Sequence, residues 1–267
     1  MDKIYDYGRS KQMRRIDDCV LLLDTRCDGS EHGGCEAMCY LLWKSAWLQR
    51  VDPVDPVEPA ARSREPATAL AQQPGDGVFR CQYTQLTAAS HAMRETRPRA
   101  WLAPLVCGNV TLGAFLVALQ TRAFNLLQRR RGGAIYPSMP TPTNDTSMRW
   151  DPLQPGDRVR VKSPEALAPA MNRNSKHRGL WFDRDMLKHC GQERRVMARV
   201  GKIIDIHSGR MIPMKTPCIV LDGVDYSGEF QTFGEQHDYL YWREAWLERL
   251  DEPTEAQAAA RSDAFSK

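Results

Sequence analysis

The chain has 267 residues, of which 42% are hydrophobic and 26% charged. These values lie near the averages of globular proteins and exclude collagen-like, wholly disordered and multi-span membrane chains. The length allows one large domain or two small ones. Thirty-seven Lys and Arg against 33 Asp and Glu leave a net charge of +4, which is too small to indicate a dedicated nucleic-acid-binding protein.

Eight cysteines are too few for a disulfide framework in a chain of this length. The first residues, MDKIYDYGRSKQMRR, contain no apolar core of a secretory signal. We therefore expect a cytoplasmic, reducing compartment, in which the thiols are free or bound to a metal.

The sequence contains an internal repeat. Residues 1–52 align without a gap with residues 200–251, at a constant offset of 199, and share fifteen identities where chance gives about two or three. The identities include Lys3 with Lys202, Cys19 with Cys218, Gly29 with Gly228, Tyr40 with Tyr239, Trp43 with Trp242, Trp47 with Trp246 and Arg50 with Arg249. We predict one fold used twice, with the four tryptophans in its cores.

The first copy, residues 1–52, begins at the position equivalent to Val200 and so has no counterpart of residues 156–199. We predict a partial SH3-like repeat. Either Met1 is an internal methionine of a longer natural chain, or the second copy or a partner chain supplies the absent strands, because an incomplete sheet leaves unpaired edges and an uncovered apolar face.

Residues 53–76 are rich in Pro, Ala and charge and are predicted to be a linker. Residues 77–150 form a helical connector. From Thr111 to Arg131, apolar residues recur at helical spacing, three arginines suit the C-terminus and Gly132 ends the run. This amphipathic helix carries Gln120 and Arg122 inside it, so it does not fit a transmembrane span.

Residues 151–251 are predicted to be a second, more complete SH3-like barrel. The strands are expected at 158–162, 196–204, 210–214 and 218–221, with a hairpin turn at 205–209. Residues 239–250 fit either a helix or a strand. Residues 252–267 are expected to be a disordered tail. The fold class is therefore mainly β with α: two related SH3-like segments, the first incomplete, joined by a linker and an amphipathic helix.

The chemistry concentrates in a cysteine cluster between residues 27 and 39. Four candidate ligands have the spacing Cys-x4-His-x2-Cys-x3-Cys, and three glycines let the backbone fold tightly around one ion: the ligands are Cys27, His32, Cys35 and Cys39. Thiolates suit zinc or an iron–sulfur cluster, and the sequence leaves both open. Cys81 is a candidate fourth sulfur, which would leave His32 beside the centre or as an exchangeable ligand.

The alternative is that these cysteines are small buried hydrophobes, as we expect for Cys19 and Cys218. Core residues have no reason to cluster with a histidine and glycines in a polar loop. In the second copy the ligands align with Tyr226, Gln231, Gly234 and Asp238, so the fold does not need them. Cys190 fits either a turn or a reactive thiol.

The run from Cys27 to Cys39, followed by Trp43-Lys44-Ser45-Ala46-Trp47-Leu48, resembles a family of uncharacterised bacterial proteins with a CDGxxHGGCxxxC motif ahead of WKxAWL. The similarity extends to residues 108–110, 124–133, 178–191 and 242–247. The resemblance implies the same duplicated architecture and a setting near genes for polysaccharide or specialised-metabolite synthesis, and it implies no activity.

Three functions follow from these observations. The first is a metal-binding accessory or scaffold protein of a biosynthetic pathway, which docks a pathway enzyme or self-associates through the incomplete barrel. The second is a metal- or iron–sulfur-dependent enzyme, in which His32 or water holds an open position beside Asp28, Glu31 or Glu36. The third, a nucleic-acid-binding barrel, is disfavoured by the low charge. The catalytic residues stay open, because the other histidines accompany no nucleophile or phosphate-loop motif.

Overall fold

The computed structural model describes residues 3–7, 12–50, 75–92, 110–138, 150–227 and 238–250, together with residues 102, 105, 106 and 108. It mixes strands and helices, as the sequence predicts. The predicted tail at 252–267 and nearly all of the predicted linker at 53–76 lie outside the described residues.

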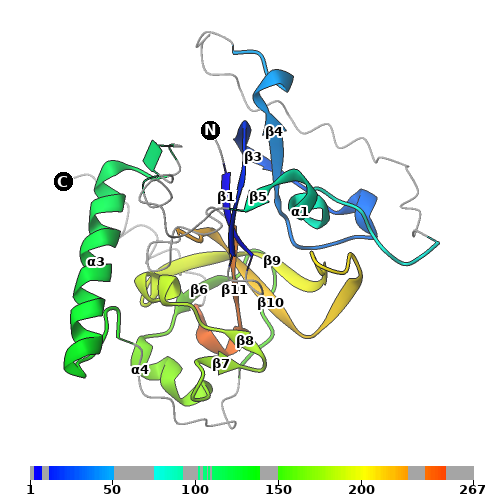
Figure 1. The fold of residues 1–267 in the computed structure, drawn as a ribbon. Helices are drawn as coiled ribbons and strands as arrows, with labels where there is room; N and C mark the ends of the chain where they lie inside the picture. Colours follow the sequence, from blue (N-terminus) through cyan, green and yellow to red (C-terminus); the bar gives the residue numbers. More distant parts are fainter. Residues whose placement is uncertain are drawn as a thin grey trace, which may run out of the picture. The chain divides into compact units, whose positions relative to one another are not determined.

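The chain divides into two compact units. The first comprises residues 1–138, 200–217 and 225–239, and the second comprises residues 139–199, 218–224 and 240–267. The boundary falls within two long strands, which therefore belong to both units. The strands, in chain order, are β1 (Lys3–Tyr7), β2 (Gln12–Ile16), β3 (Cys19–Arg26), β4 (Tyr40–Lys44), β5 (His91–Ala92), β6 (Arg158–Val161), β7 (Lys176–His177), β8 (Leu180–Trp181), β9 (Glu193–Ile204), β10 (Met211–Asp225), β11 (Tyr239–Trp242) and β12 (Leu247–Arg249) (Figure 1).

The described strands form four sheets. Their orders are β1-β2-β5, β3-β4, β7-β8 and β11-β10-β9-β6-β12. None of these sheets closes into a barrel within the part of the chain that the structure describes. The mixed α/β class is thus observed, while the predicted pair of SH3-like barrels is not seen as such.

In the first unit, β3 and β4 form an antiparallel hairpin in which Cys19 pairs with Lys44 and Arg26 pairs with Tyr40 (Figure 1). The loop between these strands carries the cysteine cluster. Beneath the hairpin lies a small core to which the short helix α1 (Leu86–Ala89) contributes. This core consists of Ile16, Cys19, Tyr83 and Leu86, with Cys39, Leu42, Cys81 and Ile206 packed against it.

Helix α3 (Leu112–Arg131) confirms the helix predicted between Thr111 and Arg131. The Thr111 side chain caps its N-terminus by accepting from the Ala114 amide at 3.2 Å, and Gly132 ends it with a φ of 69°. Phe115 and Ala118 are buried, whereas Leu116 and Leu126 are each about half exposed. No described helix has the length and apolar character required to cross a membrane.

The second unit contains a well-packed aromatic core. The Phe182 ring meets the Trp246 ring edge-on, with 5.1 Å between the ring centroids. It also meets the Trp242 ring edge-on, with 6.2 Å between the centroids of Phe182 and Trp242. Strand β6 confirms the predicted strand from Arg158, and its Val159 and Val161 are fully buried. Helix α4 (Pro164–Leu167) follows β6 and starts at Ser163, whose side chain accepts from the Ala166 amide.

Two predictions need correction, and one alternative that the sequence left open is decided. The strands expected at 210–214 and 218–221 are one continuous strand, β10, because the φ that Pro213 and Pro217 impose is compatible with extended backbone. Residues 239–249 are strand, 3-10 turn and strand rather than a helix. Trp47, predicted to be core, is 65% exposed, whereas Trp246 is buried completely.

Candidate metal centre

The loop between β3 and β4 is folded tightly by residues with left-handed backbone. Gly29, Gly33 and Gly34 have φ values of 74°, 65° and 72°, which only glycine adopts readily. The turn at Ser30–His32 starts after Gly29, whose carbonyl accepts from the His32 and Gly34 amides at 2.9 Å. The loop thus reverses within seven residues and returns Cys35 toward Cys27.

The ends of the loop are joined by a backbone hydrogen bond from the Cys27 amide to the Cys39 carbonyl at 2.8 Å. The same bond occurs 199 residues later, where the Tyr226 amide donates to the Asp238 carbonyl, also at 2.8 Å. The second loop has no cysteines, so this closure belongs to the fold and does not depend on the candidate ligands.

Glu36 anchors the middle of the loop. Its backbone amide donates to the Lys202 carbonyl at 3.0 Å, and its carboxylate accepts from the Gly201 amide at 2.5 Å and the Lys202 amide at 3.3 Å. The Lys202 ammonium donates in turn to the Gly33 carbonyl at 3.0 Å. Glu36 is therefore engaged in holding the loop.

Cys81 reaches the loop from a distant segment. The Gln82 side chain pairs with the backbone of Leu42 in β4, accepting from its amide at 2.8 Å and donating to its carbonyl at 2.9 Å. The Thr84 hydroxyl accepts from the Cys81 amide at 3.0 Å. The Phe79 amide donates to the Gly209 carbonyl at 2.8 Å. Residues 79–84 are thereby fixed on both sides of Cys81.

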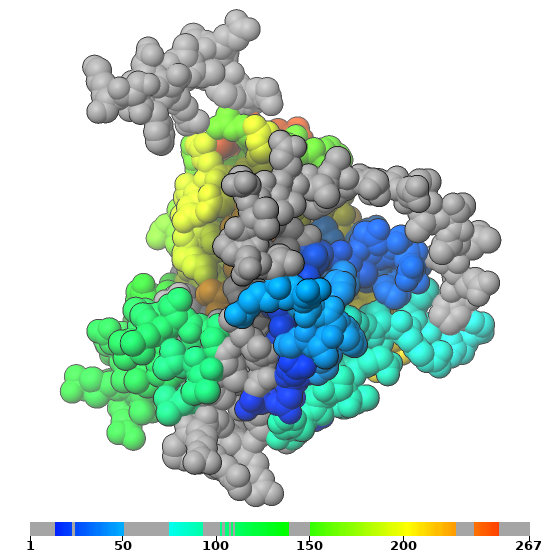
Figure 2. Space-filling model, turned by 90° about the horizontal axis from the view of Figure 1, so that it is seen from above, coloured from blue at the N-terminus to red at the C-terminus, as the bar shows by residue number. Residues whose placement is uncertain are grey.

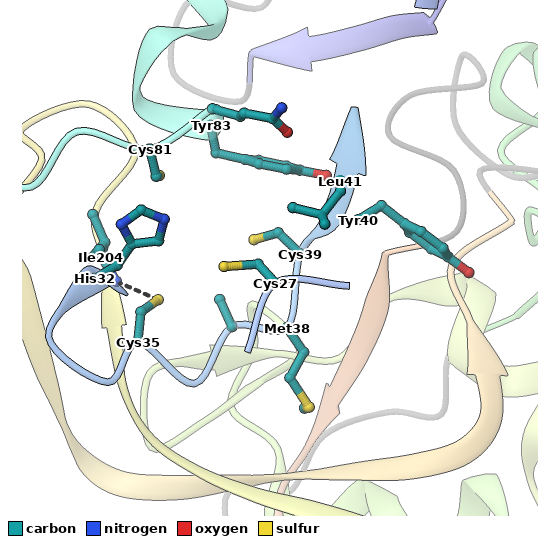
Figure 3. A pocket seen from close by; sticks show the side chains of 12 residues that line it. Cys27, His32, Cys35, Met38, Cys39, Tyr40, Leu41, Cys81, Tyr83 and Ile204 are labelled. Carbon is teal, nitrogen blue, oxygen red and sulfur yellow. Dashed lines mark hydrogen bonds between the residues drawn. The ribbon is translucent and has the colours of Figure 1, made fainter. Parts of the chain in front are cut away.

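All five predicted site residues line one small pocket of about 60 Å³: they are Cys27, His32, Cys35, Cys39 and Cys81. Figure 3 shows the four sulfur atoms and the His32 ring pointing into a common space. The other lining residues are Ala37, Met38, Tyr40, Leu41, Gln82, Tyr83 and Ile204. None of the described lining residues is a carboxylate.

The thiols in this pocket influence one another. Burial raises the pKa of the Cys39 thiol, and repulsion from Asp238, Cys35, Cys81 and Cys27 raises it further. Burial also raises the pKa of Cys27, with smaller contributions in the same direction from Cys35, Asp28 and Cys81. Without a cation, the two thiols keep their protons at neutral pH. Binding a metal ion here would release them.

One sulfur already accepts a hydrogen bond from the backbone. The Ile204 amide donates to Cys35 Sγ at 3.4 Å (Figure 3). This contact holds the sulfur at the wall of the pocket. The sequence does not predict the contribution of β9 to the site. The contributing group is the main-chain amide of residue 204, which any residue except proline would provide.

As the side chains stand, no group of three or more His, Cys, Asp or Glu among the described residues is arranged to hold a metal ion. The metal site is therefore still a prediction. What the fold brings together is the complete set of candidate ligands, from two segments separated by about forty residues of sequence.

The remaining candidates are separate from the pocket. Asp28 accepts from the Ser30 amide and hydroxyl and supports the turn. Cys190 lies in the second unit, where burial raises its pKa to about 11, so it fits the turn rather than the reactive thiol. Cys19 and Cys218 are buried, 3% and 1% exposed, as predicted. Cys39 and Cys81 border the core as well as the pocket.

The fold and site define a mixed α/β protein with a thiol-lined pocket. Comparison of the chain with models of protein families, and with curated proteins, finds no match. The pocket itself is therefore the feature from which a function can be inferred.

Proposed function

We propose that this protein is a metal-binding accessory protein of a bacterial biosynthetic pathway, whose pocket takes one thiolate-bound metal centre. The ligands are Cys27, Cys35, Cys39 and Cys81, and His32 stands beside them as an outer or exchangeable ligand. The observation that carries this proposal is the convergence of four cysteines from two separate segments on one pocket.

The small pocket favours a single zinc ion over an iron–sulfur cluster. Its volume of about 60 Å³ has room for only a few water molecules. Zinc bound by four sulfurs has Zn–S distances of about 2.3 Å. A zinc site here would require the four cysteine side chains that line the pocket to bring their sulfurs to this distance from one ion.

The pocket lining favours a structural site over an enzyme. Hydrolytic metal centres keep a position open for water and place a general base beside it. No described carboxylate lines this pocket, and Asp28 and Glu36 are engaged in loop hydrogen bonds. Four sulfurs complete the coordination of zinc and leave no position for a substrate.

We also propose that the two segments at offset 199 are copies of one SH3-like unit, open rather than closed. Equivalent 3-10 turns at Ser45–Trp47 and Glu244–Trp246 support this. Residues of the two copies also meet in equivalent pairs. The Arg26 guanidinium lies over the rings of Tyr40 and Tyr239, at 3.6 and 3.5 Å, and pairs with Asp225, its own counterpart, at 3.3 Å.

The accessory role requires a docking surface for a pathway enzyme in the cytoplasm. Helix α3 is a candidate because it exposes Leu112, Leu116, Leu119 and Leu126 along one side. These positions are spaced four, three and seven residues apart, which is the pattern of a helix that packs against another element.

The metal proposal is tested by the metal content of purified protein. We expect about one zinc ion per chain in protein purified without oxygen. Cys35→Ser should lower zinc affinity at least about tenfold, because serine does not replace a thiolate ligand. The matched control is Cys190→Ser, which removes a half-buried cysteine of the second unit and should retain the wild-type zinc content.

The same measurement separates the alternatives. If the protein shows the visible absorption of an iron–sulfur cluster, the bound cofactor is that cluster and not zinc, and the proposed ligand set is unchanged. A His32→Ala protein with full zinc content assigns all four positions to sulfur, whereas loss of zinc makes His32 a ligand. Cys35→Ser protein that keeps its full metal content would refute the proposed site.

A further inference from the structure

The two proposed copies contain the same turn in different surroundings. The residues before the two turns, Lys44 and Arg243, have φ/ψ values of −87°/141° and −90°/141°. The residues after them, Leu48 and Leu247, have −118°/138° and −116°/146°. The backbone is therefore alike. Yet the tryptophan at the end of the first turn is 65% exposed, and its counterpart in the second turn is not exposed at all.

The cover over the second turn comes from residues preceding that copy. Strand β6 pairs antiparallel with β12, placing Val161 opposite Leu247. The Lys162 amide donates to the Trp246 carbonyl at 3.0 Å. The Phe182 ring packs edge-on against the indole of Trp246. These groups all belong to residues 150–199, which precede the second copy in the chain.

The equivalent surface of the first copy is exposed in the part of the chain that the structure describes. Ser45, Ala46 and Trp47 are exposed, whereas Glu244, Ala245 and Trp246 are buried. The light-blue segment that ends at residue 50 lies on the outer surface of the face shown in Figure 2. A large indole ring at the edge of an incomplete sheet is the kind of surface that an added strand covers.

We propose that residues 45–50 form a docking site for an extended β-strand of a partner protein. This inference rests on the proposed repeat and is independent of the metal. The strand would pair antiparallel with Leu48–Arg50, as β6 pairs with β12. It would carry apolar residues at alternate positions, as β6 carries the fully buried Val159 and Val161.

The charges define the partner further. In the second copy, Arg249 pairs with Asp157, the residue that immediately precedes β6. Arg50 is the counterpart of Arg249. The partner strand should therefore be preceded by an acidic residue, which gives it the pattern acid-x-apolar-x-apolar. A strand of this chemistry can form backbone hydrogen bonds with Leu48–Arg50 and an ion pair with Arg50. A lipid surface or a nucleic acid would not provide both.

The test uses a synthetic peptide of residues 152–163, which contains Asp157, Val159 and Val161, as the probe for the full chain. The chain is labelled with 5-fluorotryptophan, and its Trp47 resonance is identified by its loss in Trp47→Phe. Alone, Trp47 should show a large fluorine shift between H2O and D2O. Peptide at about millimolar concentration should reduce that shift at least twofold.

Two controls give the result its meaning. A peptide carrying Val159→Asp and Val161→Asp should leave the Trp47 resonance unchanged. An Arg50→Glu chain should bind the original peptide at least about fivefold more weakly, because it repels Asp157. The experiment is repeated with the Cys35→Ser chain, whose unchanged response would separate this inference from the metal proposal.

Three results would overturn the proposal. The Trp47 resonance would already be shielded from solvent in the chain alone, or it would respond equally to both peptides. The proposal would also fail if Trp47 became shielded when the chain is concentrated without peptide, since a second copy of the chain would then be the occupant.

Discussion

Gly29 is the residue on which the cysteine loop turns most tightly. With a φ of 74°, it occupies the left-handed region, and a Cβ built on it would lie 1.8 Å from the Cys35 carbonyl oxygen. That oxygen is backbone and does not move aside without shifting Cys35, so the glycine is required both for its conformation and for the close approach.

Gly29→Ala should therefore disrupt the loop. We expect a loss of stability of about 2 kcal/mol or more, from left-handed strain and the clash together, and a reduced zinc content. Chemical denaturation and metal analysis measure the two effects. Gly77→Ala is the matched control, since Gly77 also has a positive φ of 66° but nothing lies near its Cβ position; its loss should be smaller and its zinc content unchanged. Equal losses would show that strain alone, without the approach to Cys35, is the cause.

Among the elements, the two equivalent 3-10 turns show that one local structure can contribute differently to the free energy of unfolding. Both turns end in tryptophan, and their flanking dihedrals agree closely. Trp246 packs against Phe182 in a closed core, whereas Trp47 faces solvent. The contribution of an aromatic residue to stability comes from the apolar area it buries, so the two should differ widely.

Trp246→Ala should lower the free energy of unfolding by about 3–5 kcal/mol, because it leaves a large cavity in the core. Trp47→Ala should change it by less than about 1 kcal/mol, as expected for a surface position. Urea unfolding of the two variants makes the comparison. A loss of several kcal/mol for Trp47→Ala would mean that Trp47 is buried in solution, in contradiction to the exposed turn.

At the scale of the whole molecule, the pocket belongs to one unit and the aromatic core to the other. Zinc that binds only the folded state stabilises the residues that form its site. Its removal should therefore act unevenly along the chain.

Hydrogen exchange before and after zinc chelation tests this expectation. Amides in residues 19–44 and 79–86 should exchange at least about tenfold faster without zinc, because local opening of the loop becomes easier. Amides of β6 and of residues 240–247 should keep their protection. Uniform acceleration over all these segments would contradict a metal effect local to the first unit.

Several elements follow from local pattern. The helix that ends at Gly132, the strand beginning at Arg158 and the hairpin turn after Ile204 are where the sequence places them, since alternation, helical spacing and glycine act over a few residues. The strand β10 was not predicted as one element, because two prolines indicate breaks in sequence, although neither interrupts it.

The cysteine pocket likewise combines features that the local sequence predicts with features that depend on tertiary contacts. Four of its ligand candidates lie within 13 residues of one another, and their spacing with glycine predicted a tight loop. Cys81 was a conjecture from the sequence, and its position depends on the Gln82 contact with Leu42. The Ile204 amide that donates to Cys35 has no sequence signal at all.

By itself, the amino-acid sequence determined the similarity of two segments at an offset of 199, the turn-forming glycines and the clustering of three cysteines with a histidine, because each is a matter of residue identity and position in the chain. Only the tertiary structure decided that Cys81 joins the loop, that Glu36 is an anchor and that Trp47 is exposed while Trp246 is buried. Burial depends on which distant segments pack over a residue, and the two similar local sequences, residues 44–48 and 243–247, do not reveal that difference.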